Sequence, residues 1–171
     1  MALPVYMKIE GQTQKVFDVE KLRDGHHEEV IVLGFDHGID TPFDAASGVP
    51  LGRIQHNPIR IMKMIDVTSP QLYAAMVGKE QLTVEFRWWR ANKDTAEEEQ
   101  YHTITISNAT VVGMKQNMSS ESMFEGGPVS KGGTRANSTP HMEEVSFSYH
   151  DIRWENMING KEAGDSYSRE T

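Results

Sequence analysis

Apolar and polar residues alternate along several stretches of this chain, most regularly at residues 82–90. Every second residue there is apolar, namely Leu82, Val84, Phe86 and Trp88. A period of two places those side chains on one face of a β-sheet and the intervening residues on the other. Upstream, a less regular run predicts a second strand, in which Lys63 falls on the same face as Ile59, Ile61 and Ile65.

Between these two strands the sequence predicts a helix of about ten residues. Thr68 and Pro70 suit the N-cap and the first turn, and Gln71 follows Thr68 by three residues, as in a capping box. Gly78 supplies a left-handed stop at the other end. Because so short a helix is marginal in water by itself, we expect it to pack on the sheet that its neighbours form.

Four further strands follow from the same pattern, at residues 3–10, 30–39, 101–114 and 143–154. In the second of them we expect Ile31, Leu33, Phe35 and Ile39 to share one face. Asn108-Ala109 is a candidate bulge. The apolar phase changes between Tyr149 and Ile152, which indicates a bend of the kind found at barrel corners.

The segment DTPFDAASGVPLGR, at residues 40–53, is rich in the Pro, Gly, Ser and Asp residues that form turns. It is longer than most connections between strands, and long ordered loops tend to be functional. We therefore regard it as the candidate functional segment of the chain.

Together these elements predict an all-β fold, mainly antiparallel, with one short flanking α-helix. Strands that have one apolar face form a barrel or a sandwich. Strand and helix alternate only around residues 68–78, so a doubly wound sheet is not expected. At 171 residues the chain can bury a sizeable core, and we predict one domain over residues 1–171.

Composition narrows the range of partners. The net charge of −8 argues against nucleic acid and against an anionic membrane, since both require a basic surface. The chain has no cysteine, which excludes disulfides and thiolate metal sites. No apolar stretch approaches the roughly 20 residues that span a bilayer. MALPVYMKIEG, the N-terminal sequence, lacks a basic region followed by a long apolar run, so we expect no cleaved signal peptide.

The residues predict no catalytic, metal or cofactor site. His26-His27-Glu28-Glu29 is the best metal candidate, but adjacent histidines in a loop do not readily converge on one ion, and we expect a solvated loop. We expect the remaining histidines to be surface or hydrogen-bonded structural residues. GGPVSKGGT, at residues 126–134, lacks the lysine that directly follows the second glycine of a phosphate-binding loop. We therefore do not predict an enzyme.

Several blocks of this sequence, in this order and spacing, resemble the Hcp (hemolysin-coregulated protein) family of bacterial type VI secretion systems. The blocks are VYMKIEGQTQ from Val5, EEVIVLGFDH ending at His37, TSPQLYAA from Thr68, LTVEFRWWR from Leu82, EEVSFSYHDIRWE from Glu143 and GDSY from Gly164. The long Gly/Ser/Met segment at residues 115–141 departs from the family pattern, as does Tyr167, where relatives often carry tryptophan.

The resemblance implies a β-barrel with a flanking helix that assembles into homohexameric rings. The rings would stack into a tube, which a contractile sheath on a baseplate propels with a spike protein at its tip and with effector proteins in its lumen. The protein would assemble in the bacterial cytoplasm and then be secreted. The segment at residues 40–53 matches the extended loop that reaches the adjacent ring, and the residues we expect to contact that ring are Thr41, Phe43, Asp44, Val49 and Leu51.

Two alternatives stay open at this point. The same architecture would suit the tail-tube protein of a phage or a related contractile particle. A small-ligand-binding β-barrel is an alternative of a different class, and it would require a monomer with a filled cavity.

Overall fold

The computed structural model describes residues 5–20, 26–117 and 141–166 of the 171. The elements in chain order are β1 (Val5–Gly11), β2 (Lys15–Val16), β3 (Val30–Val32), β4 (Gly34–Asp36), β5 (Ile39–Asp40), β6 (Gln55–His56), β7 (Ile59–Met64), α1 (Ser69–Gly78), β8 (Leu82–Ala91), β9 (Glu98–Asn117), β10 (Met142–Ser148), β11 (Asp151–Asn156) and β12 (Glu162–Ser166). The predicted segment at residues 126–134, most of the segment at residues 115–141, and Tyr167 lie outside the described residues.

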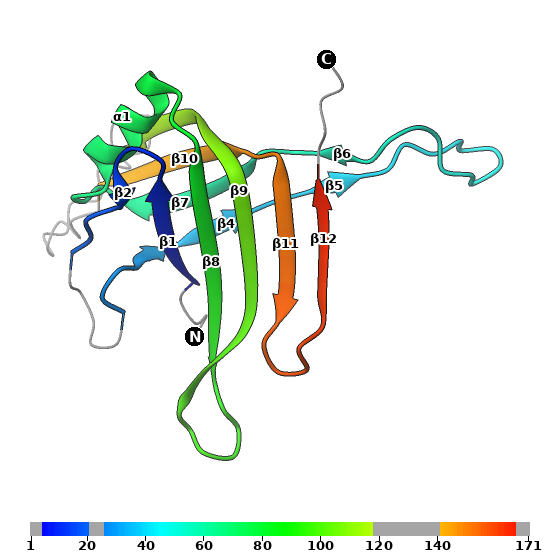
Figure 1. The fold of residues 1–171 in the computed structure, drawn as a ribbon. Coiled ribbons are helices and arrows are strands. Elements are labelled where there is room, and N and C mark those ends of the chain that lie inside the picture. The colour runs from blue at the N-terminus through cyan, green and yellow to red at the C-terminus, as the bar shows by residue number, and fades with distance from the viewer. Residues whose placement is uncertain (1–4, 21–25, 118–140, 167–171) are drawn as a thin grey trace, which may run out of the picture.

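Ten of the strands form one curled, antiparallel sheet, whose main path has the order β2-β1-β8-β9-β10-β7-β4 (Figure 1), and β5 and β6 form a separate two-stranded sheet. The short strands β3 and β4 follow each other in the chain and pair with opposite ends of this sheet. Val32 in β3 lies opposite Val5 in β1, and Phe35 in β4 lies opposite Ile61 in β7. The segment at residues 30–36 therefore closes the sheet into a barrel, which confirms the predicted fold class.

Strand β9 is long enough to belong to both halves of the barrel. Its first half pairs with β8 and β11, and its second half pairs with β10. The register against β8 shifts between Leu82 and Val84, beside Asn108, whose φ of 47° lies in the left-handed region. Asparagine tolerates this conformation better than most residues. The bulge predicted at Asn108-Ala109 is confirmed.

The bend predicted between Tyr149 and Ile152 is also confirmed, because the predicted strand at residues 143–154 divides there into β10 and β11. Strand β10 continues the half of the barrel that contains β7, whereas β11 pairs with the first half of β9. Tyr149 lies at this corner with 7% of its surface exposed.

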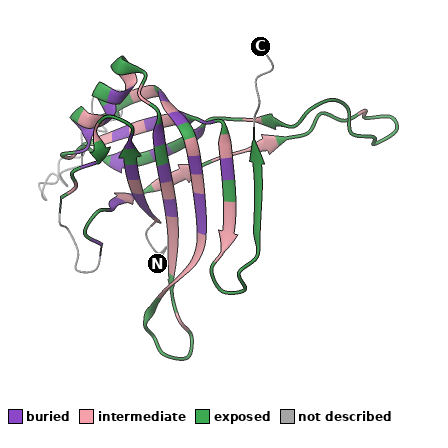
Figure 2. Cartoon of the chain, viewed as in Figure 1, coloured by how far each residue is buried: buried purple, intermediate pink, exposed green. Residues whose placement is uncertain are grey.

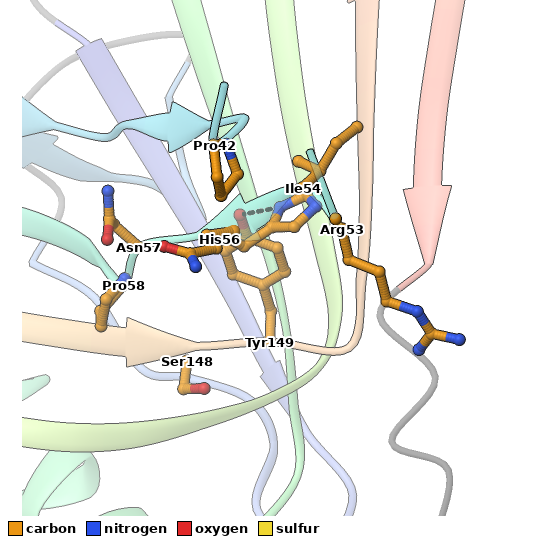
Figure 3. Close-up of a pocket in the computed structure, with 10 residues that line it drawn as sticks. Pro42, Arg53, Ile54, His56, Asn57, Pro58, Ser148 and Tyr149 are labelled. Carbon is orange, nitrogen blue, oxygen red and sulfur yellow. Dashed lines mark hydrogen bonds between the residues drawn. The ribbon is translucent and has the colours of Figure 1, made fainter. Parts of the chain in front are cut away.

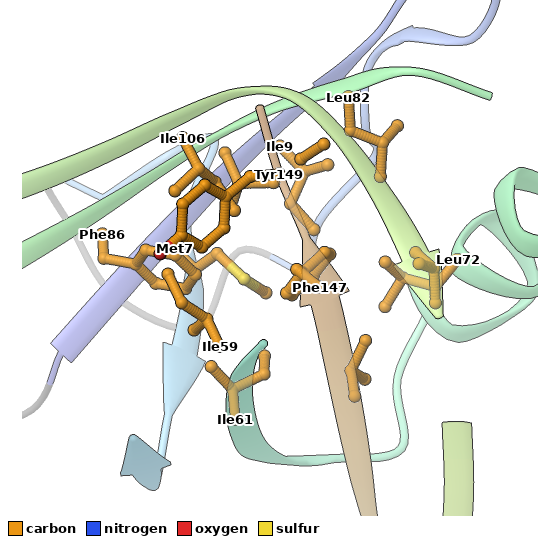
Figure 4. Close-up of a cluster of buried hydrophobic side chains, with 14 of the residues drawn as sticks. Met7, Ile9, Ile59, Ile61, Leu72, Leu82, Phe86, Ile106, Phe147 and Tyr149 are labelled. Atoms are coloured by element: carbon orange, nitrogen blue, oxygen red, sulfur yellow. The ribbon is translucent and has the colours of Figure 1, made fainter. Parts of the chain in front are cut away.

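The barrel is filled by the apolar rows that the sequence predicted, and these side chains converge between the sheet faces (Figure 4). Leu82, Val84 and Phe86 are fully buried, as are Val145 and Phe147 on the facing half. Burial along the strands alternates with exposure (Figure 2), as expected of a sheet with one solvated face.

Helix α1 packs on this core through Leu72 and Ala75, both fully buried, as predicted for a helix that cannot stand alone. Its ends differ from the prediction. The hydroxyl of Thr68 donates to the Asp66 carboxylate, and no side chain caps the helix at Thr68. The left-handed residue is Lys79, with φ of 50°, rather than Gly78.

The side-chain phase predicted for residues 30–39 is wrong. Val30 and Val32 are buried, whereas Leu33 is 53% exposed. At Leu33 the pairing partner of this segment changes from β1 to β7, since the Leu33 amide donates to the Met62 carbonyl. One continuous alternation cannot persist through this change of partner.

Strand β12 was not predicted. All five of its residues are exposed, so it has no apolar row, and it is held by its pairing with β11. Within the described residues, no helix is long and apolar enough to cross a membrane.

Candidate functional site

Residues 39–56 form a hairpin that projects away from the barrel (Figure 1). At its base β5 and β6 pair antiparallel, with Ile39 opposite His56 and Asp40 opposite Gln55. Farther out, Phe43 and Pro50 form an isolated antiparallel bridge. The amide of Leu51 donates to the carbonyl of Pro42 over 2.6 Å. Because backbone pairing continues beyond the base, the segment is an ordered arm; we call it the projecting hairpin.

The tip of the projecting hairpin is organised by Asp44. Its carboxylate accepts hydrogen bonds from the Ser47 hydroxyl (2.7 Å) and from the Ala46 amide (3.0 Å). These bonds favour the charged form and lower the pKa of Asp44 below its usual value. Gly48, with φ of 70°, supplies the left-handed residue of the turn.

Four large apolar side chains of the projecting hairpin face solvent. The exposed fractions are 65% for Phe43, 53% for Val49, 53% for Leu51 and 47% for Ile54. Apolar side chains gathered on a projecting arm, away from the core, are typical of a surface that another molecule covers.

All five residues predicted from the sequence lie on the projecting hairpin. Thr41, Phe43, Val49 and Leu51 are exposed, and Asp44 is partly buried by its own turn. Ile54 lies outside the predicted loop, because the turn-rich pattern ends at Arg53. The structure extends the hairpin to His56, and an isoleucine next to a turn-rich segment could have indicated this.

The hairpin joins the barrel at a polar corner beside a cavity of about 590 Å³ (Figure 3). Pro42, Ile54 and Pro58 supply apolar lining, and His56 and Tyr149 supply polar groups. The Tyr149 hydroxyl lies 2.7 Å from Nε2 of His37 and 2.8 Å from Nδ1 of His56. Nε2 of His56 lies 2.7 Å from the Asp165 carboxylate in β12.

The corner perturbs two of these groups. Burial, with a smaller contribution from the charge of Asp165, raises the pKa of Tyr149 to about 12, so the phenol keeps its proton. Burial and the neighbouring His56 lower the pKa of His37, while Asp36 acts in the opposite direction. The prediction of hydrogen-bonded structural histidines is confirmed for His37 and His56.

The His26-His27 segment is not simply the solvated loop that the sequence predicted. His26 is only 7% exposed, and its ring stacks on that of Tyr6 at 3.8 Å. Its Nδ1 pairs with Glu29, which in turn pairs with Arg87. No cluster of three or more metal-ligating side chains occurs among the residues that the structure describes. His26 thus covers the outer face of β1.

The comparisons with known proteins place this barrel in a family of type VI secretion proteins. Residues 6–156 match the family described as "Type VI secretion system effector, Hcp", and the chain belongs to this family. It is 32% identical to the major exported protein of Pseudomonas aeruginosa, an alignment that covers 98% of this chain and 96% of that protein. This match favours type VI secretion over the alternatives of a phage tail-tube protein and a ligand-binding barrel.

Solved structures share the fold over nearly the whole chain. The crystal structure of an Hcp protein superposes with a TM-score of 0.82 at 24% identity, covering 98% of this chain and 99% of that one. The secreted protein Hcp3 from Pseudomonas aeruginosa superposes with a TM-score of 0.73 at 26% identity, covering 96% and 100%.

Proposed function

We propose that this protein is a structural subunit of the type VI secretion tube. Six copies close into a ring, and rings stack head to tail through the projecting hairpin. The observation that carries the proposal is the exposed apolar surface of Phe43, Val49, Leu51 and Ile54 on an ordered arm outside the barrel. A heterologous contact, in which one surface meets a different surface of the next copy, produces closed rings and open stacks.

The stacking contact follows from the shape of the hairpin. Fully burying one large apolar side chain contributes about 1.5–3 kcal/mol. Four such side chains per subunit, repeated around a ring, would provide a large apolar contribution even if each is covered only in part. Phe43 and Leu51 lie on opposite limbs, held together by the bond between Leu51 and Pro42, so the hairpin needs little ordering on contact. Thr41 and Asp44 complete the proposed contact surface.

The remaining parts of the proposed function rest on the family. The chain acts as a single domain, is assembled in the cytoplasm, and leaves the cell with the spike protein when the sheath contracts on its baseplate. Effector proteins occupy the lumen of the tube. The related protein of Pseudomonas aeruginosa is named for its export, which supports the secretion of this chain. The protein acts by assembly rather than by catalysis.

The stacking role is tested by placing charge on the hairpin. We expect the double variant Phe43→Asp, Leu51→Asp to form hexameric rings, seen by negative-stain microscopy and light scattering, but few stacks, because a carboxylate cannot be buried in an apolar contact without a partner. Deletion of residues 44–49 should have the same effect on tubes in cells.

The control is Val77→Asp, which places one such carboxylate on an apolar residue of α1 that is 84% exposed. This control should stack like the wild type. Full-length tubes from the double variant or from the deletion would refute the stacking role. A monomeric wild-type protein would refute the ring.

A further inference from the structure

Four side chains from separate parts of the chain meet where the projecting hairpin joins the barrel, and Figure 3 shows two of them, His56 and Tyr149. His37 precedes β5, His56 ends β6, Tyr149 lies at the corner between β10 and β11, and Asp165 lies in β12. We call this set the corner relay. Through His37 and His56, both limbs of the hairpin contact the Tyr149 hydroxyl. The edge strand β12 joins the set through the contact between Asp165 and His56.

At neutral pH the relay has one consistent hydrogen-bond pattern. The Asp165 carboxylate can only accept, so Nε2 of His56 must carry a hydrogen and donate to it. Nδ1 of a neutral His56 then accepts from the Tyr149 hydroxyl. The phenol oxygen is left to accept from Nε2–H of His37. All three contacts are satisfied with both imidazoles uncharged.

One added proton leaves the relay intact. A protonated His56 donates from both ring nitrogens, to Asp165 and to the Tyr149 oxygen. The phenol can then reverse and donate to His37, whose proton moves to its other nitrogen. In this arrangement Nε2 of His56 keeps its 2.7 Å contact with the Asp165 carboxylate.

A second proton breaks the pattern. With both imidazoles charged, His37 and His56 each present an N–H to the same oxygen, and the phenol hydrogen loses its acceptor. A buried donor without a partner is costly. The two positive charges also repel each other across Tyr149.

We propose that the corner relay is a proton-controlled latch. With zero or one bound proton it holds the base of the projecting hairpin on the barrel, and it releases the base when the second proton binds. The latch is a property of one subunit. Its consequence for a tube, that acid loosens the contact between rings, rests on the proposed function.

Other charged groups lie on the elements next to the relay, and of these the charge of Asp36 opposes the lowering of the His37 pKa. They are Asp36 in β4, Asp40 in β5, Arg53 in the hairpin, Arg60 in β7, and His150 and Asp151 at the corner. Asp36 pairs with Arg60 at 2.7 Å, and Asp40 accepts from the Asn57 side chain. Asp151 accepts from Ser166 and Asn108. Among the described residues, these three carboxylates have partners outside the relay, whereas Asp165 is hydrogen-bonded to His56 within it.

The direction of the pKa shift on His37 agrees with a latch that opens in acid. Burial and His56 lower the pKa of His37 in the folded protein. A group of this kind contributes stability above its unfolded pKa, near 6.5, and the contribution is lost as the pH falls through the folded pKa. The latch is therefore closed at neutral pH and opens below it.

Hydrogen exchange of residues 37–57, read by mass spectrometry and corrected for the chemical rate, tests the latch. Between about pH 8 and pH 5 we expect exchange in the wild type to rise about tenfold, the effect of losing about one hydrogen bond. The variant Tyr149→Phe lacks the shared oxygen and should exchange fast at both pH values. The variant His37→Gln carries no second charge and should stay slow at both.

The matched control is His27→Gln, at an exposed histidine outside the relay; it should follow the wild type. The proposal is overturned if His37→Gln opens over the same pH range as the wild type, or if Tyr149→Phe is as protected as the wild type at the higher pH. Because exchange is read within a subunit, a protein that forms no tubes would refute the proposed function and leave this test in force.

Discussion

Lys63 shows how a charged side chain can occupy a core position of the barrel. The alternating pattern predicted that Lys63 shares a face with Ile59 and Ile61, and all three are buried. Ile65 lies outside β7 and is 40% exposed. The Lys63 ammonium pairs with Glu143 at 2.7 Å and with Asp66 at 2.8 Å. Lys63 and Glu143 are both fully buried, so neither charge is compensated by water.

We predict that breaking this buried pair lowers the free energy of unfolding. Replacing Lys63 by methionine keeps the length of the side chain but leaves Glu143 charged and buried, which destabilises a protein by about 3–5 kcal/mol. We expect a loss of that size in urea unfolding followed by circular dichroism.

The double variant Lys63→Met, Glu143→Gln is the control. It removes both charges and leaves an amide that can still bond Ser69 and Gln116, partners that Glu143 has now. It should regain most of the lost stability. If the free energy of unfolding of Lys63→Met lay within about 1 kcal/mol of the wild-type value, the pair would have to be solvated.

Individual residues also show where sequence reasoning stops. Tyr6 alternates with the apolar residues of β1, so its position predicts exposure, yet it is 1% exposed because His26 stacks on it. That contact depends on a segment some twenty residues away in the chain. Turn chemistry predicted that Phe43, Val49 and Leu51 lie in a loop, and the structure places them on the projecting hairpin. The corner relay could not, because its four members are brought together only by the fold.

At the scale of elements, regular alternation predicted the strands that have one apolar row. Strands β7, β8, β9 and β10 and helix α1 all appear where the pattern indicated them. Two of the failures have a common physical cause. Residues 30–39 change their pairing partner midway, and β12 is held by backbone bonds to β11 without an apolar row. Backbone hydrogen bonds between strands do not require an apolar row, so the sequence pattern does not predict them.

The turn between β1 and β2 supplies an element-level prediction. The Glu80 carboxylate accepts from the amides of Thr13 and Gln14, at 2.6 and 2.8 Å, and from the Gln14 side chain at 2.8 Å. Burial alone would raise the pKa of Glu80, but the hydrogen bonds from Gln14 and Thr13, with the charge of Lys15, lower it overall. The charged carboxylate therefore stabilises the fold above pH 4.5, and this contribution is lost as the pH falls through the lowered value.

We expect Glu80→Gln to cost about 1 kcal/mol at neutral pH. The difference from the wild type should shrink in acid, as the wild-type carboxyl becomes neutral too. Urea midpoints measured across this pH range check it. A difference that stays constant with pH would show that the charge is irrelevant to the turn.

At the scale of the whole molecule, charge opposes the assembly that the apolar hairpin favours. Six chains, each with a net charge of −8, would carry −48 in one ring. Salt at physiological strength screens such repulsion over about 8 Å. Rings should therefore stack weakly at low ionic strength, and tubes should lengthen as salt is added or when a baseplate nucleates them.

Light scattering across a salt series checks this prediction. The hairpin double variant Phe43→Asp, Leu51→Asp is the control, since it should remain unstacked at every salt concentration. Tube length that does not respond to salt in the wild-type protein would count against electrostatic control.

Strand β9 would have a mechanical consequence for the proposed tube, which a contractile sheath would push along its axis. Because its 20 residues run unbroken through both halves of the barrel, covalent bonds as well as side-chain packing join the two halves. Load applied to one half passes to the other along the backbone itself. Sliding the halves apart would require breaking ladder hydrogen bonds along this strand together, so the subunit should transmit thrust as a stiff unit.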